Sequence, residues 1–323
     1  MVRIASVSLF VTLCALSAAP ASAADAYPIR PIRLVVPFAP GGGTDINARI
    51  LADPIGQALG QTVVVDNRPG AGSSIGCDIA AKSAPDGYTL LLGTISLTIN
   101  AAVYKKLPFD VQRDLVPITR VSDQPSILVV NPSLPARTFK DFIALVRSQP
   151  GKFNFGSAGH GTGSHLASEL LWLKVNAELV HVPFKGTGPA LNALLANEIT
   201  VDMSTFASAL LHVKSDRLRA YAVTTLKRAS PLPNVPTLAE SGIQDFEYAA
   251  WYGLFAPAGT ARSIVDKLHK AAIASLNSPR VRQLYESQGL NATPTTPAQF
   301  AKYIDSERKK WADVVREANI AQL

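Results

Sequence analysis

Residues 36–45 read VPFAPGGGTD. The β-rich apolar run at residues 32–38 enters three consecutive glycines, and Thr44 then stands where a helix N-cap belongs. Apolar residues at helical spacing follow over residues 46–59. Glycines let the backbone approach a ligand closely, and the unpaired amides at the start of a helix favour an anion. This stretch therefore predicts a strand, a glycine loop and a helix that together bind an anionic group.

A second loop of the same kind lies near the middle of the chain. Residues 155–165 read FGSAGHGTGSH and also join a predicted strand to a predicted helix. The loop adds hydroxyl groups from Ser157, Thr162 and Ser164, and His160 adds an imidazole. Neither loop contains an arginine, but four charge-assisted hydrogen bonds of about 1.5–3 kcal/mol each can hold a carboxylate. The two loops predict two helix N-termini on opposite walls of one cleft.

Strand-like and helix-like segments alternate along the chain, which predicts an α/β fold built from parallel βαβ units. One series covers residues 32–92 and a second covers residues 127–203. We expect two lobes with a hinge and an interlobe cleft, where small ligands usually bind. The expected division is a discontinuous first lobe, residues 25–120 plus 219–323, and a second lobe, residues 121–218.

The N-terminal segment has the features of an export signal. Arg3 precedes an almost wholly apolar run over residues 4–19, and the small residues Ala21 and Ala23 offer a cleavage site. We therefore expect residues 1–23 to be a cleaved signal peptide and the mature chain to be periplasmic. Lipidation of Cys14 is not expected, because Leu13 stands where that motif needs a small residue. The later sequence has no run of about 20 apolar residues, so no membrane span is expected.

Charge and cysteine content narrow the class of partner. The chain has 31 Lys and Arg against 24 Asp and Glu, a formal net charge of +7. This mild excess suits an anionic ligand, and it could equally serve solubility alone. The basic residues are scattered rather than gathered in an aromatic-containing patch, so nucleic acid is not an expected partner. Cys77 is the one cysteine beyond the signal peptide, so we expect a buried thiol and no intramolecular disulfide.

Further motifs occur in an order typical of one family of binding proteins. They are PIRLVVPF at residues 31–38, NRPGAG at 67–72, APDGYTL at 84–90, VVNPSLP at 129–135 and APAGT at 256–260. With the two glycine loops, they make the chain resemble the tripartite tricarboxylate transporter substrate-binding family, also called the Bug family. The resemblance covers essentially the whole mature sequence.

The resemblance implies a periplasmic type II solute-binding fold that closes on a small organic carboxylate, with no enzymatic activity, metal or cofactor. Its members deliver the ligand to permease subunits of a tripartite transporter, or dock on a sensor kinase instead, and we expect a monomer. The two family loops correspond to residues 38–45 and 157–164. The candidate ligand-binding residues are Phe38, Gly42, Gly43, Thr44, Asp45, Ser157, His160, Thr162, Gly163, Ser164, Ser204 and Thr205.

Three positions depart from the family pattern. His160 stands where many relatives have Asn, Phe184 where the usual residue is Tyr, and Ser204 where several have Asp. The missing acid at position 204 disfavours a ligand ammonium group. We therefore expect a dicarboxylate, a tricarboxylate or an aromatic carboxylate rather than an amino acid.

Two other patterns suggest different chemistry. Residues 72–76 read GSSIG and fit the G-x-S-x-G pattern of a hydrolase with Ser74 as nucleophile. Such a nucleophile joins a strand directly to a helix, whereas residues 67–70 separate Ser74 from its strand, so hydrolysis is the weaker hypothesis. His160, His165 and His181 could ligate a metal, but no acidic or cysteine cluster accompanies them, so zinc is not expected.

Overall fold

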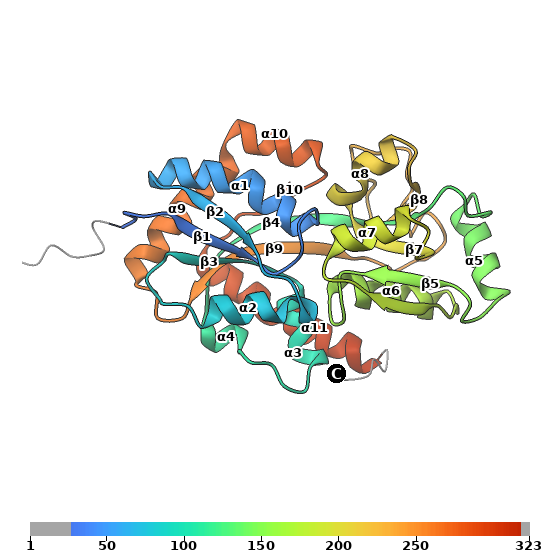
Figure 1. The fold of residues 1–323 in the computed structure, drawn as a ribbon, viewed down its shortest axis with the longest axis horizontal. Coiled ribbons are helices and arrows are strands. Elements are labelled where there is room, and N and C mark those ends of the chain that lie inside the picture. The colour runs from blue at the N-terminus through green and yellow to red at the C-terminus, as the bar shows by residue number, and fades with distance from the viewer. Residues whose placement is uncertain (1–26, 318–323) are drawn as a thin grey trace, which may run out of the picture.

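One sheet runs through the molecule (Figure 1). The computed structural model describes residues 27–317, so the predicted signal peptide and Cys14 lie outside the described residues. The ten strands include the path β2-β1-β3-β9-β4-β7-β5-β6, and β8 and β10 each pair with β4. The strands are β1 Ile32–Val36, β2 Val63–Asn67, β3 Thr89–Thr94, β4 Leu115–Val130, β5 Asn154–Ser157, β6 Val180–Pro183, β7 Val201–Thr205, β8 Arg219–Val223, β9 Ala249–Pro257 and β10 Asn291–Ala292.

Helices flank this sheet along its length (Figure 1). They are α1 Gly43–Leu59, α2 Ser74–Ala81, α3 Ser96–Val103, α4 Val111–Asp114, α5 Phe139–Arg147, α6 Gly163–Lys174, α7 Thr187–Leu195, α8 Phe206–Lys214, α9 Arg262–Asn277, α10 Pro279–Ser287 and α11 Pro297–Glu317. No helix among residues 27–317 is long and apolar enough to cross a bilayer.

The first glycine loop forms the predicted strand-to-helix unit. β1 is apolar, almost fully buried and parallel to both β2 and β3, as expected for a strand covered on both faces. Gly42 is the N-cap of α1, and the left-handed Gly60 ends this helix at its C-cap. The carboxyl end of β1 and the amino end of α1 therefore meet at the edge of the sheet that faces the second lobe (Figure 1).

β4 is the strand that joins the lobes. It pairs antiparallel with β9 as far as Pro125, and from Ser126 onward it pairs with β7 and β8. The return crossing lies close by, because Thr224 donates its amide to the Ser126 carbonyl and Tyr248 donates its amide to the Thr224 carbonyl, both at 3.0 Å. The hinge is thus a set of neighbouring main-chain segments held together by hydrogen bonds.

This pairing differs from the expected lobe boundaries at 120/121 and 218/219. The partner of β4 changes between Pro125 and Ser126, and β8 pairs with the second-lobe half of β4 rather than with the first-lobe sheet. β4 is one continuous strand, and the polar stretch SDQPS at residues 122–126 lies where its partner changes, a few residues after the expected boundary.

Two helices near the cleft were not expected from the sequence. α3 has six buried residues in eight, so it lacks the one-sided hydrophobic pattern of a surface helix. α8 begins directly after β7, with Thr205 both ending the strand and forming the N-cap. Neither helix has a loop or an amphipathic pattern that would separate it from its neighbouring strand in the sequence.

Candidate functional site

A cavity of about 40 Å³ lies between the lobes. One water needs roughly 10–15 Å³ on this measure, so the space holds a few waters or one small polar group. Eight of the predicted residues line it: Phe38, Gly42, Gly43, Thr44, Thr162, Gly163, Ser164 and Thr205. The other lining residues are Thr94, Ile95, Ser96, Ser126, Ala158, Thr187, Tyr248, Ala250 and Tyr252.

Five helices present their amino ends to this cavity. For α1, α3, α6, α7 and α8, the N-cap or a first-turn residue is among the lining residues. In none of these five does the N-cap side chain accept a hydrogen bond from the first turn. By contrast, Thr138 caps α5 and Ser278 caps α10 through their hydroxyl groups, and neither helix contributes a lining residue. The caps of these helices therefore leave first-turn amides unused. Three of those amides are taken by other side chains: Gly43 N donates to Thr205, Ser96 N to Thr94 and Ala207 N to Gln124.

The two predicted loops supply the clearest of these amides. The first hydrogen bond inside α1 runs from Ile46 N to Gly42 O at 3.0 Å, and that inside α6 runs from Leu166 N to Thr162 O at 3.1 Å. Amides that precede Ile46 and Leu166 have no acceptor within their own helix. They carry the positive end of the helix dipole, so each helix start favours a negative charge beside its amides.

The cavity is uncharged, with polar groups set in a largely apolar lining. Among the lining residues that the structure describes, none has a charged side chain. Burial raises the pKa of the Tyr248 and Tyr252 phenols well above the ordinary value, so both remain neutral hydrogen-bond donors. The cavity thus offers amide, hydroxyl and phenol donors to an anion, with no fixed anion that would repel it.

The lobes are in contact on both sides of the cavity. Ala39 N donates to Lys185 O at 3.0 Å, and Gly43 N donates to Thr205 Oγ1 at 3.2 Å. On the other side, Tyr104 donates its hydroxyl to His160 O at 3.3 Å. These bonds join residues of different lobes, so this is a closed conformation.

Asp45 does not line the cavity; it holds the first loop in shape. Its carboxylate accepts hydrogen bonds from Gly41 N and Asn67 Nδ2 at 3.0 Å and pairs with Arg49. Burial opposes ionisation of Asp45, but the bonds from Arg49, Gly41 and Asn67 outweigh it and lower the pKa. Asp45 therefore remains charged and ties the glycine turn to α1 and β2.

Ser204 also lies outside the lining. It is fully buried and donates its hydroxyl to Asp202 within β7. Burial raises the pKa of Asp202 to about 7, although the bond from Ser204 lowers it in part. The hydroxyl of Ser204 is thus used in a hydrogen bond to the buried carboxyl group of Asp202, whereas Thr205, the next residue, lines the cavity.

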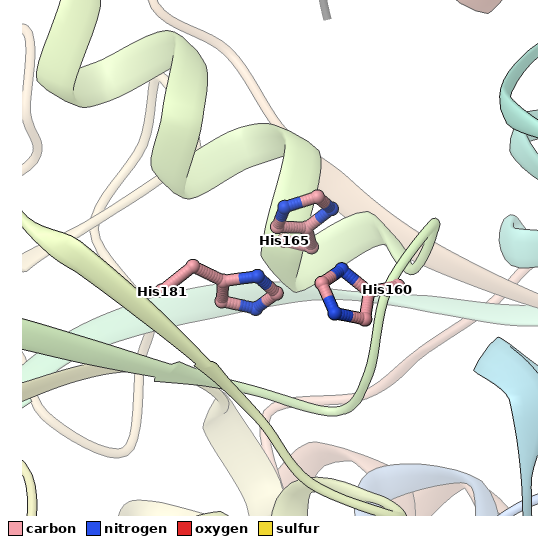
Figure 2. A group of neighbouring side chains, drawn as sticks. All are labelled: His160, His165 and His181. Atoms are coloured by element: carbon pink, nitrogen blue, oxygen red, sulfur yellow. The ribbon is translucent and has the colours of Figure 1, made fainter. Parts of the chain in front are cut away.

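Ser157 and His160 lie beside the cavity in a cluster of histidines. Ser157 Oγ lies 2.6 Å from His181 Nε2, and the ring of His181 stacks on that of His165 with centroids 4.0 Å apart. His160 is exposed and completes the group, with its centroid 4.8 Å from His181 and 5.5 Å from His165. Figure 2 shows these three rings gathered from a loop, a helix and a strand.

Several lining residues were missed from the sequence. Thr94 and Ser96 lie where β3 passes into α3, and Thr187 begins α7, so both are further strand-to-helix junctions of the kind that revealed the first two. The junction at Thr187 did contain glycines, Gly186 and Gly188, whereas the junction at Thr94 offered hydroxyl residues and the single Gly93. Ser126 and Tyr248 come from the hinge crossings, which no local pattern identifies.

Within residues 27–317, no histidine or acid hydrogen-bonds to Ser74 in a way that could activate it as a nucleophile. Its side chain is 5% exposed, and its Oγ accepts a hydrogen bond from Asn100 Nδ2 at 3.2 Å. An amide cannot take the proton from a serine hydroxyl, so this contact is structural. Cys77 is fully buried, as expected, and burial raises the pKa of its thiol to about 12.

A comparison with protein families identifies the chain. The model of the tripartite tricarboxylate transporter family receptor, TctC, matches residues 47–320. The chain belongs to the TctC family. TctC proteins are binding proteins rather than enzymes, so the Ser74 hydrolase hypothesis is rejected.

Similar proteins match over almost the whole length of this TctC chain. Protein BugT of Bordetella pertussis is 40% identical over 316 residues, which are 97% of this chain and 96% of that protein. The periplasmic binding protein BugD superposes with a TM-score of 0.90 at 34% identity, covering 92% of this chain and all of that one. Rpa4515 of R. palustris with adipate gives a TM-score of 0.89 at 32% identity, with 92% and 100% covered. These matches confirm the predicted α/β periplasmic solute-binding fold.

Proposed function

We propose that this protein captures a small organic carboxylate between its lobes and presents it to the permease of a tripartite tricarboxylate-type transporter. One observation carries the proposal: five helix N-termini converge on a single cavity whose described lining residues are all uncharged, although Thr94 and Gln124 already accept one first-turn amide each from α3 and α8. Amides at helix N-termini favour an anion, and a carboxylate accepts several of them at once.

The donors are sufficient in number and strength. Hydrogen bonds to a charged group contribute about 1.5–3 kcal/mol each, and a micromolar complex needs about −8 kcal/mol in total. Thr44 and Ser164 add hydroxyl groups from opposite lobes, so a carboxylate group between them would bridge the lobes, and the lobes would have to stand further apart than in this structure to admit the body of a ligand such as adipate. Adipate in the related Rpa4515 supports a carboxylate as the ligand class.

The rest of the lining favours di-, tri- or aromatic carboxylates over amino acids. The ammonium group of an amino acid needs a negatively charged hydrogen-bond acceptor. Asp45, the acid in the first loop, is already paired with Arg49. The phenols of Tyr248 and Tyr252 can instead donate to a distal oxygen or contact an apolar body. The proposed location is the periplasm, after removal of residues 1–23.

A thermal-shift screen of the purified mature protein tests the proposal. The compounds are adipate, citrate, benzoate, acetate and glutamate, each followed by calorimetry if it raises the melting temperature. A carboxylate at a hundredfold excess over its Kd should stabilise the folded state by about 2.7 kcal/mol. If glutamate binds and none of the other acids does, the assignment of ligand class is wrong. If no acid binds, the capture function itself is wrong.

The transport step needs a separate test in the bacterium. Deleting the gene should abolish uptake of the radiolabelled acid that the screen selects, and a plasmid copy should restore it. Unchanged uptake together with a lost transcriptional response to the acid would favour docking on a sensor kinase instead.

A further inference from the structure

We propose that residues 70–74 and the side chain of Asn100 form a latch on the first lobe, which receives the backbone of residues 159–161 of the second lobe when the lobes close. The segment overlaps the GSSIG pattern at residues 72–76, which does not serve hydrolysis. The inference rests on the proposed function in one respect, because closure matters there as the step that traps the carboxylate. The latch residues are not among those that line the cavity, so the latch can also be tested without a ligand.

The two lobes approach each other at the latch too closely for side chains. A β-carbon on Gly72 would overlap the carbonyl oxygen of His160. A β-carbon on Gly161 would lie 2.7 Å from Oδ1 of Asn100 and 2.9 Å from Cε2 of Tyr104. Each of these contacts joins one lobe to the other, and overlaps of this kind can be relieved only by moving the atoms apart. The closed arrangement therefore requires glycine at positions 72 and 161.

The first-lobe side of the latch has an unusual backbone. Ala71, Gly72 and Ser73 all have positive φ angles, at 45°, 57° and 85°. Alanine and serine rarely adopt this left-handed conformation, and such strain persists where neighbouring groups fix it, most often at functional sites. Here Asn100 fixes it, because its Nδ2 donates to the Gly72 carbonyl oxygen at 2.9 Å. The same Nδ2 also donates to the hydroxyls of Ser73 and Ser74, at 3.3 and 3.2 Å.

The second-lobe side of the latch is a turn that its own hydrogen bonds hold in shape. Thr162 donates both its amide and its hydroxyl to the carbonyl oxygen of Gly159, at 3.3 and 2.7 Å. A β-carbon on Gly159 would lie 3.5 Å from the Cα atom of Gly72, so this part of the turn also rests on the first lobe. Residues 162–164 continue from the turn into α6 and line the cavity. The docked turn therefore fixes residues 162–164 relative to the first lobe.

Two polar groups set the strength of the latch. Tyr104 donates its hydroxyl to the His160 carbonyl oxygen, which favours closure. Oδ1 of Asn100 is buried against Gly161 and has no hydrogen-bond donor among residues 27–317. This disfavours closure, because opening moves Gly161 away and lets water reach the oxygen. The two effects oppose each other, so the latch alone closes a minor part of the population and the ligand closes the rest.

Gly161→Ala tests the latch from the second lobe, because the atoms nearest to its β-carbon all belong to the first lobe. Gly151→Ala is the matched control: Gly151 lies in the same lobe with the same φ of +69°, and its β-carbon would meet no atom closer than 3.9 Å. The backbone strain of the two variants is thus alike. In calorimetry with the acid that the screen selects, Gly161→Ala should bind at least tenfold more weakly than Gly151→Ala.

Gly72→Ala and Gly60→Ala form a second pair in the first lobe. Their φ angles are +57° and +74°, and a β-carbon on Gly60 would have nothing within 4 Å. The same difference in affinity is expected within this pair. Urea unfolding of all four variants checks that each one folds, and either pair decides the question if a variant of the other does not.

Single-molecule fluorescence energy transfer tests the latch without a ligand. The dyes are attached to Gln57→Cys and Lys214→Cys, one exposed position on each lobe, and the fully buried Cys77 does not compete for the label. The labelled parent protein should show a minor closed population. Gly161→Ala and Gly72→Ala should lose this population, whereas both control variants should keep it.

The latch is excluded if the latch variants and their controls have equal affinities and equal closed populations. A labelled parent protein with no closed population in the absence of ligand would exclude it as well. If the wild type binds none of the screened acids, the proposed capture function fails, and the ligand-free populations still decide for or against the latch.

Discussion

Single residues at the glycine loops decide how closely the lobes approach. A β-carbon on Gly43 would lie 2.7 Å from Tyr252 Oη and 2.9 Å from Thr205 Oγ1, and would also overlap Gln124. Gln124 and Tyr252 belong to the first-lobe part of the sheet and Thr205 to the second lobe, so a glycine is needed here both for packing within the first lobe and for the close approach of the lobes. The neighbouring Gly42 is less restricted, because its β-carbon would meet Thr187 at an ordinary 3.6 Å.

Gly43→Ala should therefore weaken binding of the screened carboxylate at least tenfold, measured by calorimetry. Gln124 and Tyr252 would have to shift whether the lobes are open or closed, and the closed form would in addition lose its fit against Thr205. Gly42→Ala is the matched control and should lose much less affinity. Equal losses in both variants would show that the loop has no special requirement at Gly43.

The buried carboxyl group of Asp202 leads to a prediction about how the stability of the protein depends on pH. Its folded-state pKa of about 7 lies above the ordinary value of 3.8, so the folded protein binds this proton more tightly than the unfolded chain does. The resulting stabilisation is complete below about pH 4 and is lost as pH rises through 7. At about 1.4 kcal/mol per pH unit, it is at most roughly 4 kcal/mol.

Asp202→Asn removes this titration. Urea unfolding between pH 4 and pH 8 should show the free energy of unfolding of the wild type declining relative to that of the variant as pH rises. A constant difference across that range would mean that Asp202 has an ordinary pKa in the folded protein.

At the scale of elements, one side chain of β4, that of Gln124, links β9 to helix α8 of the second lobe. Gln124 is fully buried; its Nε2 donates to the Tyr252 hydroxyl on β9, and its Oε1 accepts from Ala207 N at 3.1 Å. Ala207 lies in the first turn of α8, so the hinge strand caps that helix in place of the helix's own N-cap.

Gln124→Ala should destabilise the protein by about 1–3 kcal/mol in urea unfolding, because it leaves the buried Ala207 amide without this acceptor. Gln57→Ala, on the exposed face of α1, is the control and should change the free energy of unfolding by less than about 0.5 kcal/mol. The proposed capping role of Gln124 is excluded if the two variants are equally stable.

At the scale of the whole molecule, the proposed function requires an equilibrium between open and closed lobes. The closed form is held by few direct bonds, of which that from Tyr104 to His160 O lies outside the cavity lining. A ligand that bridges the lobes adds to these bonds, so it shifts the equilibrium toward the closed form.

Tyr104→Phe should lower affinity for the screened carboxylate severalfold without touching the ligand, since a hydrogen bond contributes about 0.5–1.5 kcal/mol. Small-angle scattering of the ligand-free variant should give a radius of gyration no smaller than that of the wild type. Tyr88→Phe removes a hydroxyl that accepts from Ile29 N within the first lobe, and it should leave affinity unchanged. Unchanged affinity in Tyr104→Phe would mean that this contact does not contribute to closure.

Local sequence determined the features that depend on neighbouring residues. The alternation of strand-like and helix-like segments predicted the α/β fold. Glycines between a strand and a helix marked the loops at 36–45 and 155–165. Eight of the predicted site residues line the cavity, because a strand-to-helix junction places backbone amides at a known edge of the sheet.

Only the tertiary structure decided which distant residues meet. It showed the amino ends of α3, α7 and α8 at the cavity, the change of partner along β4, and the pairing of Ser204 with Asp202. It also stacked His181 of β6 on His165 of α6, two rings on different elements. Local propensity and periodicity describe each element by itself, whereas these contacts depend on how elements pack across the sheet and between the lobes.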